Sequence, residues 1–136
     1  MFIVYPVIFT ATNDEKNTYL VEIPDINGMT EGYGLEDAIR MAKDYIGGYY
    51  LDTNEILPAS DISEIDVSKG KFADVGKTFA SLVDIDLLAY RRANNMKTVR
   101  RNVSLPSWLN KAAEDAGLNV SKVLQEALID KLQIEQ

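Results

Sequence analysis

The sequence of 136 residues contains no cysteine and no histidine. Without cysteine, disulfide bonds and thiolate metal sites are excluded, which is compatible with a reducing cytoplasm. Without histidine, the chain lacks the commonest general base and metal ligand, and Ser–His or Cys–His nucleophile pairs are excluded as well. Neither a phosphate-binding loop nor a dinucleotide-binding glycine pattern occurs. An enzyme with this composition would have to rely on carboxylates, lysine or tyrosine. We expect a protein that is not an enzyme and that uses no cofactor or metal.

Long hydrophobic runs are also missing. The apolar segment MFIVYPVIF is nine residues long and contains Pro6, so it is too short to cross a bilayer. It lacks the basic leader and the small-residue cleavage site of a signal peptide. We expect a soluble, cytoplasmic protein with no membrane partner, and we interpret this segment as a first strand.

Positive charge is scarce and unevenly distributed. The chain has 14 Lys and Arg against 21 Asp and Glu, a formal net charge of -7. Residues 1–90 sum to -10, whereas residues 91–111 hold six basic residues and no acid. Such a basic block in an acidic chain is typical of a segment that meets an anionic partner. A solvated basic linker would have the same composition, so the local pattern has to decide.

The first ninety residues show strand and helix periodicities. Alternating apolar residues predict strands at residues 2–12, 18–24, 29–31 and 78–88. Spacings of three and four predict one helix, with an apolar stripe of Leu35, Ala38, Ile39, Ala42, Ile46 and Tyr49. Residues 52–77 are aperiodic and predict a long loop. We expect an α+β domain over residues 1–90, with one helix on a small antiparallel sheet. The polar, basic residues 91–97 predict a linker.

Residues 98–136 predict a separate module of one strand and two helices. In VRRNVSLPSWL (residues 99–109), Val103 and Leu105 share one strand face before Pro106 begins a helix. Gly117 predicts the end of this helix and Asn119 the cap of the next. The module is shorter than the roughly 40 residues that usually fold alone. We therefore expect a homodimer in which two strands pair as an antiparallel ribbon over four helices.

Such a ribbon fits the major groove of B-DNA. With Val103 and Leu105 facing inward, Arg100, Asn102 and Ser104 face outward, where Arg can contact guanine and Asn adenine. The N-terminus of the second helix offers N–H groups to a phosphate. The predicted DNA-binding residues are Lys97, Arg100, Arg101, Asn102, Ser104, Asn119 and Ser121. The pattern NVSLPSWL…AG.NVSKVLQEAL resembles the ribbon-helix-helix repressors, although a plain dimerisation module would also fit.

The segment YPVIFTATNDEKNTYLVEIPDINGMTEGYGLEDAIRMAKDYI (residues 5–46) resembles the HicB antitoxin domain. The residues that match the family pattern are Tyr5, Pro6, Pro24, Asp25, Gly28, Thr30, Glu31, Gly32, Leu35, Glu36 and Ala38. The family often has Cys and Thr or Ser where this chain has Met29 and Gly34. The resemblance implies a partial RNase H-like fold, neutralisation of a small basic HicA-type RNA-cleaving toxin, and repression of the shared operon.

Two other functions remain open at this point. The N-terminal domain could sense a small metabolite in a ribbon-helix-helix repressor. It could also be a metal-dependent nuclease using Asp25, Glu31, Asp84 and Asp86, but no spacing identifies a cluster. The acidic domain suits a basic partner, because charge complementarity speeds association. We take Asp25 and Glu31 as acidic candidates for toxin contact, and whether dimers assemble further is left open.

Overall fold

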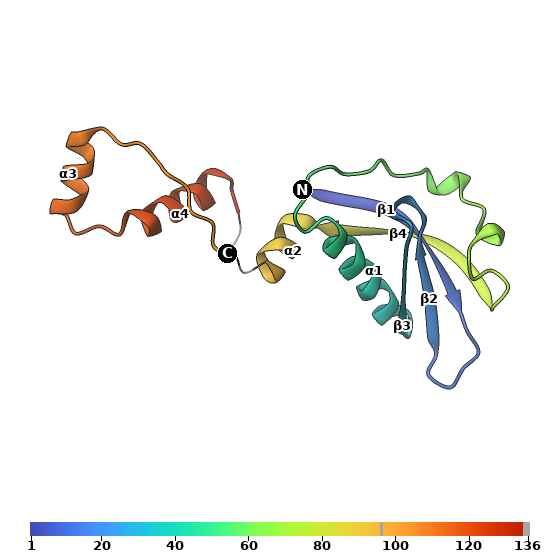
Figure 1. The fold of residues 1–136 in the computed structure, drawn as a ribbon. Helices are drawn as coiled ribbons and strands as arrows, with labels where there is room; N and C mark the ends of the chain where they lie inside the picture. The colour runs from blue at the N-terminus through green and yellow to red at the C-terminus, as the bar shows by residue number, and fades with distance from the viewer. Residues whose placement is uncertain (96, 135–136) are drawn as a thin grey trace. The chain divides into compact units, whose positions relative to one another are not determined.

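The computed structural model of the chain describes residues 1–95 and 97–134. The chain divides into two compact units, Met1–Lys97 and Thr98–Gln136. Figure 1 shows a sheet packed against a helix in the first unit, and two helices preceded by an irregular segment in the second.

The first unit is built on an antiparallel sheet. Within the described residues its strands are β1 (Phe2–Ala11), β2 (Thr18–Ile23), β3 (Gly28–Tyr33) and β4 (Lys77–Asp86), paired in the order β3-β2-β1-β4. A short 3₁₀ turn, η1 (Pro24–Ile26), connects β2 to β3. Each of the four strands expected in residues 1–90 is present, with its ends shifted by at most two residues. The predicted α+β class and small antiparallel sheet are confirmed.

The helix α1 (Leu35–Tyr49) covers one face of the sheet. The middle of its predicted apolar stripe, Ala38, Ala42 and Ile46, is fully buried. The two ends of the stripe were wrongly predicted, because Leu35 and Tyr49 are 40% and 48% exposed. Helical spacing explains the second error: the stripe that passes through residues 42 and 46 continues four residues on, at residue 50, and the buried tyrosine is the one at that position.

Glycines in β3 allow α1 to approach the strand closely. A Cβ atom at Gly32 would lie 2.5 Å from the backbone nitrogen of Ala38. Gly28 is equally crowded, since a Cβ there would lie 2.4 Å from the ring of Tyr45. The helix therefore packs directly on the backbone of this edge strand, where a larger side chain would force the two apart.

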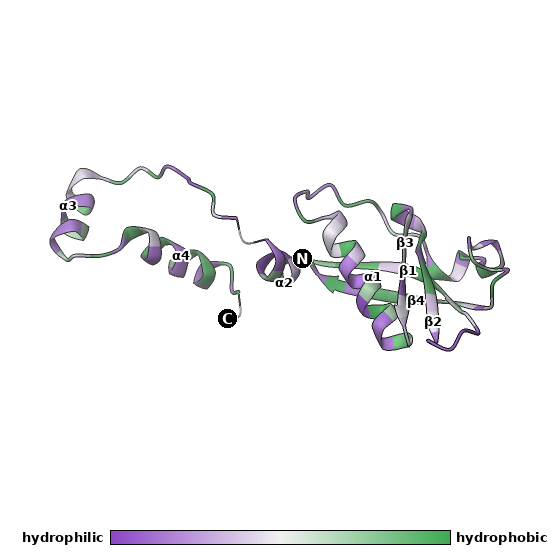
Figure 2. Cartoon of the chain, turned by 60° about the horizontal axis from the view of Figure 1, so that its bottom comes forward, coloured by the Kyte–Doolittle hydropathy of each residue, from purple (hydrophilic) through white to green (hydrophobic). Residues whose placement is uncertain are grey.

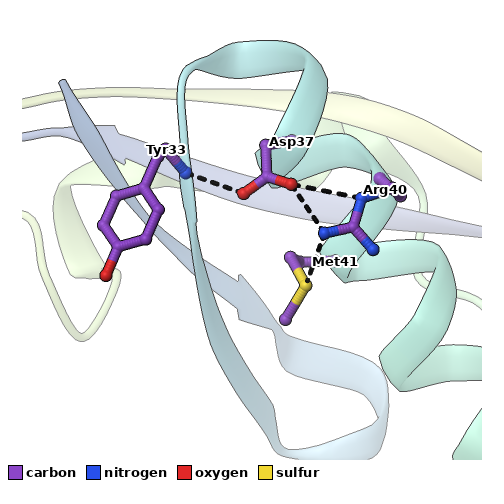
Figure 3. Close-up of polar contacts among 4 residues, drawn as sticks. All are labelled: Tyr33, Asp37, Arg40 and Met41. Carbon is purple, nitrogen blue, oxygen red and sulfur yellow. Dashed lines mark hydrogen bonds and ion pairs between the residues drawn. The ribbon is translucent and has the colours of Figure 1, made fainter. Parts of the chain in front are cut away.

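The start of α1 is held by a polar cluster, shown in Figure 3. The Asp37 carboxylate accepts a hydrogen bond of 2.9 Å from the backbone N–H of Tyr33 and one of 2.7 Å from Arg40 Nη2. Both interactions favour the charged carboxylate, so they lower the pKa of Asp37, the backbone bond contributing most. Gly34 caps the helix at a φ of 86°, a left-handed conformation that suits glycine.

The expected long loop after α1 contains two short turns and is tied to the sheet. Its 3₁₀ turns are η2 (Ile62–Glu64) and η3 (Val67–Lys69), each capped by the preceding aspartate. The buried Glu22 side chain in β2 accepts a hydrogen bond of 2.9 Å from the backbone of Lys71. A Cβ atom at Gly70 would lie 3.5 Å from the Ile8 side chain. This part of the loop therefore packs on the sheet face opposite α1.

The predicted linker at residues 91–97 is wrong for its first four residues, which belong to a helix. Helix α2 (Leu87–Asn94) begins directly after β4, and Leu87 is fully buried. The ring of Tyr90 lies over Gly47 of α1, and its hydroxyl donates a hydrogen bond of 2.9 Å to Asp44. The polar, basic composition concealed the helix, because its contacts with the rest of the unit are made by a few residues, among them Leu87 and Tyr90. Met96, within the predicted linker, lies outside the described residues.

The second unit contains α3 (Ser107–Asp115) and α4 (Val120–Lys131). Both confirm the helices expected after Pro106 and after Asn119. Gly117 ends α3 at a φ of 66°, and its N–H donates to the carbonyl of Glu114 while Leu118 donates to that of Ala113. This hydrogen-bond pair is the Schellman motif, which explains why glycine marked the helix end correctly.

Candidate functional site

The expected ribbon strand is not formed in the single chain. Residues 97–105 carry no β-bridge, although a strand was predicted from residue 98. A strand requires a hydrogen-bonded neighbour, and a ribbon that pairs across a dimer axis has none when one copy is present. The structure therefore corrects the prediction for the isolated chain and leaves the dimer ribbon as a prediction.

The predicted DNA-binding side chains are exposed in two parts of this unit. Five lie in the irregular segment and two at the start of α4: Lys97, Arg100, Arg101, Asn102, Ser104, Asn119 and Ser121. Within residues 1–95 and 97–134, the cations of the irregular segment form no ion pair. Their charge is available to an external anion.

Asn119 has a structural role at the start of α4. Its side-chain oxygen accepts a hydrogen bond of 3.1 Å from the backbone N–H of Lys122. This N-cap satisfies one of the unpaired N–H groups of the first turn. Asn119 therefore has a capping role in this structure, and its contact with DNA, like that of the exposed Ser121, stays a prediction.

The second unit has a large apolar surface and, within its described residues, no core. Neither α3 nor α4 contains a fully buried residue. Figure 2 shows hydrophobic residues along both helices. The exposed large apolar side chains of the unit are Val99, Val103, Leu105, Trp108, Leu109, Leu118, Val120, Val123, Leu128 and Leu132. A unit that exposes so many large apolar side chains and buries none in its helices favours a partner that covers them.

Arg91, which the charge pattern places in the basic block, is used inside the first unit. Its Nη2 donates hydrogen bonds of 2.9 and 2.7 Å to the carbonyls of Tyr50 and Thr53, just after α1. These carbonyls lie at the negative end of the helix dipole, where a guanidinium is favourable. The basic block therefore contains an arginine that joins α2 to α1 rather than facing an external phosphate.

The two acidic candidates for toxin contact differ in their surroundings. Asp25, in η1, accepts hydrogen bonds from the backbone N–H and the hydroxyl of Ser60 and so anchors the long loop. Glu31 lies exposed on the edge strand β3. Asp25 therefore has a structural role, and contact of either residue with a toxin stays a prediction.

The carboxylates considered for a nuclease centre have other partners. Asp84 pairs with Lys43 at 3.7 Å, and Asp86 caps α2 through the N–H of Ala89. Within the described residues, no three acidic side chains are grouped so that they could hold a metal ion. Two-metal chemistry needs such a group. The geometry gives the nuclease hypothesis no support.

The buried polar centre of the domain is a pair of tyrosines. The hydroxyls of Tyr5 and Tyr50 are hydrogen-bonded, and Tyr5 also donates to the carbonyl of Leu57. Burial and the neighbouring hydroxyl raise the pKa of Tyr5 above its ordinary value, so it stays neutral. These hydroxyls fasten the loop after α1 to the core. The sequence analysis did not predict this pair. The only sign of it was the apolar alternation of β1, which puts Tyr5 on the face toward the core.

Comparison with known families decides the assignment. Residues 5–127 match the family described as the HicB-like antitoxin of bacterial toxin-antitoxin systems. The chain belongs to the HicB-like antitoxin family. This confirms the resemblance inferred from residues 5–46 and extends it into the C-terminal unit. Membership in an antitoxin family favours a regulatory protein over an enzyme.

Two solved structures are similar to this chain over most of its length. One, from a toxin-antitoxin complex of Streptococcus pneumoniae, is 26% identical with a TM-score of 0.61, covering 96% of this chain and 99% of that one. Another, the antitoxin HicB of Burkholderia pseudomallei, is 24% identical with a TM-score of 0.49, covering 98% and 99%. No curated protein matches this chain. In the described residues, no helix is long and apolar enough to span a membrane.

Proposed function

We propose that this HicB-like antitoxin neutralises a small basic HicA-type RNA-cleaving toxin and represses its own operon by binding operator DNA. The family membership supports the antitoxin role. The -10 charge of residues 1–90 supports a basic partner, because opposite charges speed encounter and fix orientation. The similar pneumococcal protein comes from a toxin-antitoxin complex, which makes a toxin the natural partner to test.

The observation that carries the DNA-binding part is the combination of a coreless apolar unit with an exposed basic segment. Pairing two copies would bury Val103 and Leu105 under the helices and turn Arg100 and Asn102 outward. A two-stranded ribbon of this kind enters the major groove, with side chains of alternate residues against base edges. This proposal includes the ribbon-helix-helix arrangement, the homodimer and a partial RNase H-like fold of the first unit.

The two activities can be tested separately with the full chain. Co-expression with the HicA-type toxin of the same operon should restore growth that the toxin alone arrests. Purified protein should bind the promoter fragment of that operon more tightly than unrelated DNA of equal length. Growth arrest that persists despite soluble antitoxin contradicts the first activity. Equal affinity for both DNA fragments contradicts the second.

A further inference from the structure

The sheet face opposite α1 is only partly covered. Side chains alternate along β1, so Phe2 and Val4 point away from the core that Ile3 and Tyr5 join. The long loop packs over the middle of this face near Ile8. The end of the face formed by the first residues of β1 stays open, and Phe2 is 70% exposed.

Strand β4 extends this open area. Its residues Leu82, Asp84 and Asp86 are on the same face, since they lie opposite Pro6, Val4 and Phe2 in the strand register. Leu82 is 54% exposed although it is a large apolar residue in the interior of a strand. We name the exposed apolar side chains of this area the β1–β4 patch, which consists of Phe2, Val4, Leu57 and Leu82.

A cavity adjoins the patch. It has a volume of about 310 Å³ and is lined by residues 1–5 together with Ile56, Leu57 and Ala59. It forms because β1 pairs with β2 only from Ile8 onward, so the loop after α1 lies beside the unpaired part of the strand. Its volume is at the small end of the range for ligand pockets, roughly 300–1,000 Å³, which suits one inserted side chain.

The patch has an acidic border. Asp84 and Asp86 lie opposite Val4 and Phe2, and the turns η2 and η3, which contact β4, carry Asp61, Glu64 and Asp66 in or beside them. Asp84 forms an ion pair of 3.7 Å with Lys43, and the two side chains are 61% and 45% exposed. Exposed pairs of this kind contribute little to stability, so a partner cation can replace the lysine.

We propose that the β1–β4 patch is the docking surface for the toxin. The partner it fits is a basic protein that places an apolar or long basic side chain in the cavity and its cationic groups beside Asp84 and Asp86. A second copy of this chain fits less well, because two acidic borders would face each other. This proposal rests on the proposed function, which supplies the basic partner but not the surface.

The test compares binding of the inactivated HicA-type toxin of the same operon to full-length variants by calorimetry. Leu82→Ser and Phe2→Ser should each weaken binding roughly tenfold or more, as expected for central apolar contacts. The matched control is Met29→Ser, which removes a similarly exposed apolar side chain on β3. It should change the affinity less than about twofold. Thermal unfolding of each variant establishes that the domain is folded.

A second pair of variants tests the acidic border. Asp84→Asn should slow association and weaken its dependence on salt, whereas Glu15→Gln, at an exposed acid in the turn between β1 and β2, should leave both unchanged. If the wild type binds and the patch variants bind equally well, the surface is wrong and the antitoxin function stands. If folded wild-type protein does not bind the toxin, the proposed function itself fails. A change in the toxin-free oligomeric mass with Leu82→Ser would make the patch an interface between copies and overturn the proposal.

Discussion

Truncation of one apolar side chain on α4 should show whether the C-terminal unit is a dimer or is stable as a single copy. Leu128 is 51% exposed in the single chain, on the helix face expected to pack in the dimer. Complete burial of a leucine side chain contributes about 1.5–3 kcal/mol, so covering the exposed half contributes about 0.75–1.5 kcal/mol per copy. Leu128→Ala changes both copies and should cost about 1.5–3 kcal/mol of dimer stability. This corresponds to a dissociation constant raised roughly 10- to 150-fold.

The substitution leaves the helix itself intact. Alanine has the highest helix propensity, so α4 should not be weakened locally. The assay is sedimentation equilibrium of the full chain over a range of concentrations, with Gln125→Ala as the control at an exposed polar position of the same helix. Unchanged dissociation of the Leu128→Ala protein, or an equal shift in the control, would refute the reasoning that this face is buried between copies.

Three further predictions concern packing, DNA recognition and pH. Gly32→Ala should destabilise the N-terminal domain by about 1–3 kcal/mol because the helix backbone lies against the glycine. Gly48→Ala, where a Cβ meets only an atom 3.7 Å away, should raise the stability by roughly 0.5–1 kcal/mol. Urea unfolding measures the stability of both variants. Equal changes in the two would contradict the close packing of α1 on Gly32. Asn102→Ala should cost about 1–3 kcal/mol for operator DNA alone, whereas Lys97→Ala should weaken all sequences and lower the salt slope by about 1. Titrations at several salt concentrations separate the two, and an unchanged operator affinity would refute the assignment of strand faces. Folding lowers the pKa of Asp37, so its carboxylate stabilises the folded domain at any pH above the ordinary pKa of aspartate. This stabilisation is lost as the pH falls through the lowered pKa, below about 4. In the Asp37→Asn protein the free energy of unfolding should therefore fall less over this pH range. A pH dependence identical to that of the wild type would contradict this.

The regular parts of the fold could be predicted because the sequence carries their periodicity. Alternation in residues 2–12 identified the face that Tyr5, Val7 and Phe9 present to the core. The helix of residues 35–49 followed from its apolar spacing and its first-turn acids. In the second unit, Pro106 and Gly117 marked helix boundaries because their backbone preferences are strong.

The errors arose where a few tertiary contacts outweigh the local pattern. Helix α2 has a basic, polar sequence, and its placement depends on Tyr90 against Gly47 and on Arg91 at the end of α1. These contacts join segments about forty residues apart, so no local window contains them. The strand predicted from residue 98 is absent from the single chain, because a strand requires a hydrogen-bonded neighbour, and its pairing across a dimer stays a prediction.

The candidate site was predictable in part. The basic segment was visible from charge alone, and its predicted side chains lie on the surface. The role of Asp25 could not be foreseen, because its partner Ser60 lies 35 residues away in an aperiodic loop. The β1–β4 patch was also hidden, since Phe2 and Leu82 look like core residues until the coverage of each sheet face is known.

The most direct test of the antitoxin role is RNA cleavage by the purified HicA-type toxin while the full-length chain is titrated in. We predict that cleavage falls in proportion to the added antitoxin and stops at a fixed molar ratio. Leu82→Ser should require much more protein for the same inhibition. Cleavage that continues unchanged in a molar excess of folded antitoxin would contradict the central claim.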